Sequence, residues 1–119
     1  MLVAFSVAPS GVPQQSVSDD PVSVPAQAPA APSDSVHDAV AAAVAIVRES
    51  GLPHRTDTMF TTIEGEWDEV FDVVKRATEA VGRFGSRVSL VLKADIRPGY
   101  TGELTGKLDR LESAIEELG

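Results

Sequence analysis

The sequence predicts a single α+β domain with the element order β-α-β-β-α-β and one further helix at the end. Two alternating apolar patterns predict the outer strands, near residues 2–8 and 87–97. Three stretches with apolar residues at helical spacing predict helices at about 36–50, 66–82 and 103–118. A polar, threonine-rich stretch between the first two helices predicts two short strands. This order is the ferredoxin-like split βαβ arrangement, in which helices cover one face of an antiparallel sheet.

The first strand is followed by a segment of very different composition. In residues 2–8, Val3, Phe5 and Val7 form one apolar face and small residues form the other. Residues 12–34 are rich in Pro, Ala and Ser and contain no aromatic residue that could anchor them to a core. The prolines, including Pro32, are expected to prevent a helix there. We therefore expect a flexible insertion, with disorder favoured over a functional lid, inside one domain spanning residues 1–119.

The boundaries of the first two helices carry recognisable signals. Ser35 is expected to be the N-cap of the first helix, and Gly51 its C-cap. The extended stretch 54–64 is expected to form two strands joined by a turn near Thr58 and Met59. The second helix begins after Gly65, and Trp67 falls on its apolar stripe, so this side chain is expected in the core.

The alternating pattern of the last strand predicts a second sheet face, which the helices do not cover. Val91, Lys93 and Asp95 share that face, and Ala4 and Ser6 of the first strand are expected beside them. A face that is neither fully polar nor fully apolar favours a partner, so the sequence predicts a homo-oligomer.

Composition excludes several classes of function. The net charge of −8 argues against binding to nucleic acid or to anionic membrane surfaces. No run approaches the roughly 20 apolar residues that span a bilayer, and a cytoplasmic location is the default expectation. There is no cysteine, which excludes disulfides and thiolate metal sites. The two histidines do not combine with carboxylates at metal-ligand spacing, so neither a metal nor another cofactor is expected.

The stretch from Met59 to Val70, Met-Phe-Thr-Thr-Ile-Glu-Gly-Glu-Trp-Asp-Glu-Val, resembles the signature of a family of small bacterial and archaeal thiamine-binding proteins. The opening Phe5-Ser6-Val7-Ala8-Pro9 and the segment from Val91 to Arg97 are similar to that family's first and last strands. The resemblance implies a ferredoxin-like fold and a homodimer or homotetramer. It also implies non-catalytic binding of thiamine or its hydroxymethylpyrimidine precursor. The insertion at 12–34 departs from the family pattern next to the expected site.

Candidate ligand-binding residues follow from this resemblance and from their chemistry. A carboxylate can accept from an aminopyrimidine amine or balance a thiazolium charge, although Glu64 could equally just end a strand near a helix dipole. Hydroxyls can bond a ring nitrogen, and a lysine on the open face could contact the ligand or only an ion-pair partner. The candidates are Ser6, Asp57, Met59, Thr61, Thr62, Glu64 and Lys93.

No nucleophile-base arrangement or phosphate-binding loop is present in the sequence, so an enzyme is the least favoured function. The alternative to ligand binding is a structural or regulatory oligomer that binds a protein partner through the open sheet face.

Overall fold

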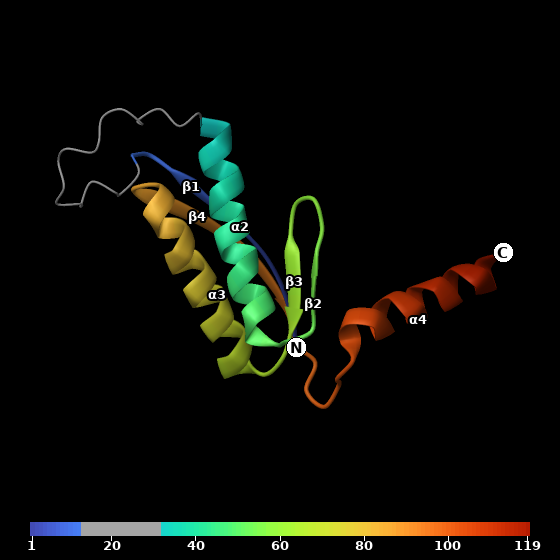
Figure 1. Ribbon diagram of the computed structural model, residues 1–119. Coiled ribbons are helices and arrows are strands. Elements are labelled where there is room, and N and C mark those ends of the chain that lie inside the picture. Colours follow the sequence, from blue (N-terminus) through green and yellow to red (C-terminus); the bar gives the residue numbers. More distant parts are fainter. Residues whose placement is uncertain (13–31) are drawn as a thin grey trace, which may run out of the picture.

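The computed structural model describes residues 1–12 and 32–119, apart from the side chains of 32–35. In this part of the chain, four strands form one antiparallel sheet in the order β2-β3-β1-β4. The strands are β1 (Leu2–Ser10), β2 (His54–Thr56), β3 (Thr61–Glu64) and β4 (Arg87–Asp95). Helices α2 (Pro32–Ser50) and α3 (Trp67–Val81) cover one face, and α4 (Glu103–Leu118) projects from the other side (Figure 1). The predicted ferredoxin-like α+β fold with an additional helix is confirmed.

The core lies between the sheet and the two covering helices. Val3, Phe5 and Val7 of β1 point into it, as the alternation predicted, and Ile63 of β3 lies beside them. The helices contribute small apolar side chains: Ala39, Ala43 and Val47 from α2, and Val70, Val73, Val74, Ala77 and Val81 from α3. Small residues allow the helices to approach the sheet closely.

Two element boundaries differ from the expectation. Strand β1 continues through Pro9 and Ser10, because β4 pairs with it along the whole stretch. Proline is tolerated there since β1 is an edge strand beyond Phe5, where β3 no longer accompanies it. Helix α2 begins at Pro32, before the expected Ser35 cap, because proline is compatible with the first turn of a helix. The rest of the predicted insertion, 13–31, lies outside the described residues.

The α2 helix ends as predicted. Gly51 has a φ of +77°, a left-handed conformation that favours glycine, and its N–H bonds the carbonyl of Arg48. The chain then forms β2, turns through residues 57–60, and returns as β3. The Asp57 N–H donates to the Phe60 carbonyl at 2.9 Å, which closes this turn close to the expected position.

The expectation that Trp67 lies in the core is wrong. Its side chain is 54% exposed and stacks on Phe71, with ring centroids 5.3 Å apart. Trp67 is the first residue of α3, and the buried face of this helix begins only at Val70. Helical spacing places Trp67 near the apolar stripe, but the packed layer does not extend to the first turn.

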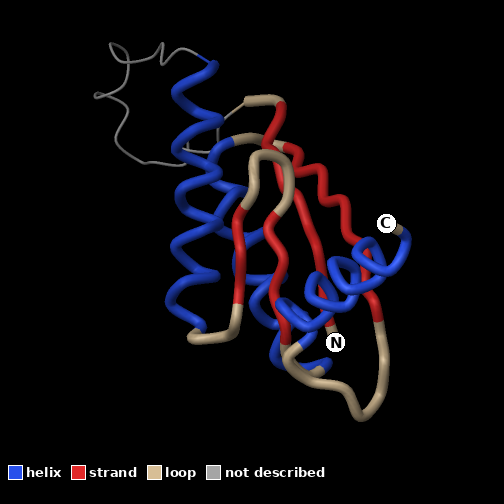
Figure 2. The backbone as a smooth tube through the Cα atoms, turned by 90° about the vertical axis from the view of Figure 1, so that its right-hand side faces the viewer, coloured by secondary structure: helices blue, strands red, loops and turns tan. Residues whose placement is uncertain are grey.

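Helix α4 begins against the open sheet face, on the side opposite α2 and α3 (Figure 2). Only its first turns contact the body of the molecule, and the rest of the helix extends outward (Figure 1). Across the open face, Ala4 of β1 pairs with Thr62 of β3 on one side and Lys93 of β4 on the other. Val91 lies on the same face and is 55% exposed.

In the part of the chain that the structure describes, none of the helices is long and apolar enough to cross a membrane.

Candidate functional site

A cavity of about 210 Å³ lies between α2, the middle of β1 and the turn that joins β2 to β3. Its α2 wall is apolar and includes Val40, Ala43, Val44 and Val47. The opposite wall is the β2–β3 turn, to which Met59, Phe60 and Thr61 contribute. The cavity therefore combines an apolar lining with a few polar groups, which is typical of small-molecule sites.

The short length of β3 creates this cavity. Strand β3 pairs with Leu2–Phe5 of β1, whereas β4 pairs with Leu2–Ser10. Beyond Phe5, the β3-side edge of β1 thus has no strand partner among the described residues. Successive residues of a strand direct their main-chain groups to alternate sides, so at least one residue of 6–8 directs main-chain groups toward this edge. Ser6, Val7 and Ala8 also line the cavity, so this edge of β1 forms part of its wall.

Four of the seven predicted ligand-binding residues line this cavity: Ser6, Asp57, Met59 and Thr61. Ser6 lies between Phe5 and Val7, which point into the core, so its side chain is directed to the open sheet face and it borders the cavity with its main chain. Thr61 is buried, and its Oγ1 lies 3.2 Å from Oγ1 of Thr56. Met59 is 75% exposed at the rim. The Asp57 carboxylate is also at the surface, where it pairs with the Nε of Arg55 at 3.3 Å.

The other three predicted residues, Thr62, Glu64 and Lys93, do not line this cavity. Thr62 and Lys93 lie in one row across the open sheet face, on either side of Ala4. Residues 61 and 62 are adjacent in β3, so their side chains point to opposite faces of the sheet. The structure therefore separates two threonines that the sequence placed in one site.

Glu64 lies at the end of β3, and its carboxylate caps α4. One oxygen accepts the main-chain N–H of Glu103 at 2.9 Å and the other accepts that of Leu104 at 3.1 Å. The N-cap residue of α4 is Gly102, which has no side chain to bond these groups. Glu64 supplies the missing acceptor from another element, and its negative charge complements the helix dipole. The carboxylate is buried, with the residue 7% exposed.

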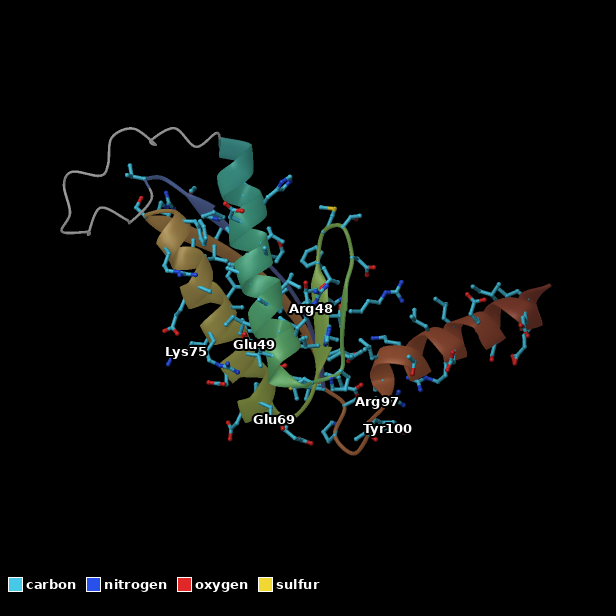
Figure 3. The ribbon with its side chains drawn as sticks, in the orientation of Figure 1. Arg48, Glu49, Glu69, Lys75, Arg97 and Tyr100 are labelled. Carbon is cyan, nitrogen blue, oxygen red and sulfur yellow. The ribbon has the colours of Figure 1, made fainter. Side chains whose placement is uncertain are left out.

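A second cavity of about 380 Å³ adjoins Glu64, and Glu66, Glu69 and Tyr100 also line it. Its carboxylates are largely engaged in the structure. Glu66 and Glu69 form the capping box of α3, in which Glu69 Oε1 accepts the Glu66 N–H at 3.0 Å. Arg97 stacks 3.8 Å from the centre of the Tyr100 ring, and Figure 3 shows both in the turn before α4. This end of the molecule mainly fixes where α3 and α4 begin.

An ion pair between Asp95 of β4 and Lys107 of α4 also anchors the start of α4. The hydrogen bond from Lys107 and its positive charge lower the pKa of Asp95 below its usual value. Asp95, which shares the open face with Lys93, therefore has its ion-pair partner within the same chain.

Sequence reasoning missed the α2 side of the cavity. Val40 and Val44 belong to the apolar spacing that predicted this helix, yet Val40 is 43% exposed and both line the cavity. Phe60 was also missed. A signal was present, since Met59 and Phe60 are two large apolar residues within an otherwise polar turn.

Among the residues that the structure describes, no group of three or more histidine, aspartate or glutamate side chains could hold a metal ion.

Comparison with known proteins places the chain in a family. A family model described as thiamine-binding protein matches residues 22–112. The chain is 43% identical over 113 residues to the UPF0045 protein Mb1933 of Mycobacterium bovis, covering 94% of this chain and 91% of that protein. It is 35% identical over 83 residues to the UPF0045 protein sll0230 of Synechocystis, covering 69% of each.

Solved structures agree with the fold. A hypothetical protein, MJ1052 of Methanocaldococcus jannascii, superposes with a TM-score of 0.67 at 23% identity, covering 93% of this chain and 94% of that one. A domain of unknown function from Bacillus cereus, DUF77, superposes with a TM-score of 0.61 at 28% identity, covering 87% and 83%. The family match extends over most of the chain, and the resemblance seen in residues 59–70 lies within it. The chain belongs to the thiamine-binding protein family.

Proposed function

We propose that this protein binds thiamine or its hydroxymethylpyrimidine precursor, without chemical change, in the cavity between α2, β1 and the β2–β3 turn. The observation that carries the proposal is the gathering of Asp57, Met59, Thr61 and the main chain at Ser6 around one apolar cavity in a member of this family. Binding without catalysis is consistent with the absence of a nucleophile-base arrangement in the sequence.

The size and chemistry of the cavity favour the pyrimidine half of the ligand. A volume of about 210 Å³ is below the roughly 300–1,000 Å³ of sites for drug-sized molecules, so a single ring suits it better than a whole thiamine. The main-chain groups at the β3-side edge of β1 and the Thr61 hydroxyl can bond the ring nitrogens and the amine. In a bound thiamine, the cationic thiazolium would extend toward the rim, near the Asp57 carboxylate.

Glu64 and Thr62 have a smaller part in this proposal than the sequence suggested. The carboxylate of Glu64 already accepts two main-chain N–H groups, so its contribution to a ligand would compete with the cap of α4. Lys93 and Thr62 are better placed for a contact on the open sheet face. We propose that this face takes part in a homo-oligomer, a dimer or a tetramer.

A matched pair of α2 variants tests the cavity. We expect Val44→Phe to fill the cavity and weaken binding of hydroxymethylpyrimidine at least tenfold, a loss of about 1.4 kcal/mol. Ala45→Phe adds a similar side chain on the exposed side of the same helix and should leave the affinity unchanged. Titration calorimetry with thiamine, hydroxymethylpyrimidine and the isolated thiazole measures both effects.

Two results would contradict the proposal. If the wild-type protein gives no heat and no thermal shift with any of the three ligands at millimolar concentration, it is not a binding protein for this class. If the pyrimidine binds equally to wild-type and Val44→Phe protein, the ligand occupies another site. In the first case, a stable complex with a second protein through the open sheet face becomes the better interpretation.

A further inference from the structure

Two threonine hydroxyls form a pair in the wall of the cavity between α2, β1 and the β2–β3 turn. Thr56 of β2 lies directly opposite Thr61 of β3, and Thr61 lies opposite Phe5 of β1 on its other side. Directly opposite residues of antiparallel strands direct their side chains to the same face of the sheet. The three side chains therefore form one row on the face that the helices cover, and all three residues line the cavity.

The two hydroxyls differ in their access to water. Thr61 is buried, whereas Thr56 is exposed and belongs to the strand at the edge of the sheet. Their Oγ1 atoms lie 3.2 Å apart, and either atom can be the donor. Within the described part of the chain, this is the only side-chain hydrogen bond of Thr61. The Thr61 hydroxyl thus depends on Thr56, while the Thr56 hydroxyl can also bond solvent.

The hydrogen bond between these hydroxyls can run in either direction, because a hydroxyl both donates and accepts and its proton rotates. If Thr56 donates to Thr61, the Thr61 proton is directed elsewhere and can be given to an acceptor on a bound molecule. If Thr61 donates to Thr56, the Thr61 oxygen can accept from a donor on a bound molecule. Neither direction leaves a hydroxyl unsatisfied, since Thr56 bonds water in the second case.

Without Thr56, the two cases would no longer be equivalent. A ligand that fills the cavity displaces water from Thr61. If that ligand presents an acceptor, the Thr61 proton still has a partner. If it presents a donor, the Thr61 oxygen accepts from it and the Thr61 proton is left without an acceptor, and an unsatisfied buried polar group is costly.

We propose that the Thr56–Thr61 hydroxyl pair sets the range of ligands that the cavity binds, with Thr61 as the contact and Thr56 as its positioning residue. By reversing its direction, the pair bonds pyrimidines that carry either an amine or an accepting oxygen at the position facing Thr61. This inference rests on the proposed function, because it assigns a pyrimidine to this cavity. It adds that the amine is not required for binding, and that this tolerance comes from Thr56.

Titration calorimetry with two ligands tests the pair: hydroxymethylpyrimidine, and its analogue in which a methoxy group replaces the amine. The ring nitrogens are the same in both, but the methoxy oxygen only accepts. We expect the wild-type protein to bind both. Thr56→Val should weaken binding of the amine ligand about tenfold and leave that of the methoxy ligand nearly unchanged. Valine favours strands, so the variant should keep its fold.

Two further variants separate the roles of the hydroxyls. Thr56→Ser keeps the hydroxyl and should restore the wild-type ratio of the two affinities, which a purely structural effect of the valine would not explain. Thr61→Val removes the contact itself and should weaken binding of both ligands.

The outcomes distinguish this inference from the proposed function. If the wild-type protein binds the amine ligand but not the methoxy ligand, the cavity is restricted to donors and the inference fails while the proposed function stands. The same holds if Thr56→Val changes both affinities equally or changes neither. A wild-type protein that binds neither ligand would overturn both the inference and the proposed function.

Discussion

Replacing Phe5 with alanine is expected to lower the free energy of unfolding by about 3–5 kcal/mol, as is usual for a buried phenylalanine. Phe5 is 3% exposed in the centre of β1, and it also forms part of the cavity wall. Domains of this size are stable by only about 5–15 kcal/mol, so the variant would be substantially unfolded at moderate temperature. Urea denaturation followed by circular dichroism measures the change.

Phe60→Ala is the matched control for this prediction. It removes the same side chain from the other side of the cavity, where the residue is 37% exposed, and should therefore cost clearly less stability. Equal losses for the two variants would show that Phe5 is not a core residue in solution.

The second large effect concerns the cap of α4. Replacing Glu64 with alanine leaves the N–H groups of Glu103 and Leu104 without their acceptor, and an unsatisfied buried group costs about 1–3 kcal/mol. Because 1.4 kcal/mol corresponds to a factor of ten, we expect these two amides to exchange with solvent about 10-fold to 100-fold faster. Hydrogen exchange followed by nuclear magnetic resonance measures each amide separately.

Glu79→Ala, on the exposed face of α3, controls for the loss of one negative charge. It should not change the exchange of Glu103 or Leu104. Unchanged exchange in Glu64→Ala would mean that water replaces the carboxylate without penalty, and that Glu64 is free to bind a ligand as the sequence suggested.

The secondary structure was largely predictable because its signals are local. Helix α4 occupies the residues that its leucine spacing predicted, and β1 and β4 follow their alternating patterns. Local signals failed where the burial of a side chain depends on which other elements pack against it. Trp67 has the spacing of a core residue but lies in a first turn that the packed layer does not reach.

The candidate site was predictable only in part, for a similar reason. Asp57, Met59 and Thr61 are close in the sequence, so their gathering follows from one turn. The role of Glu64 could not be predicted locally, because its carboxylate caps α4, a helix that begins 39 residues later in the chain. The cavity itself depends on where β3 stops pairing with β1, and strand ends are weakly encoded in a threonine-rich stretch.

The β3-side edge of β1 beyond Phe5, which has no strand partner among the described residues, also affects how the protein behaves at high concentration. Exposed strand edges can recruit strands from other molecules and so begin aggregation. Here the edge beyond Phe5 is short and includes Pro9, which has no main-chain N–H to donate to an incoming strand. The same stretch can therefore remain open to a small molecule without becoming a template on which further chains assemble.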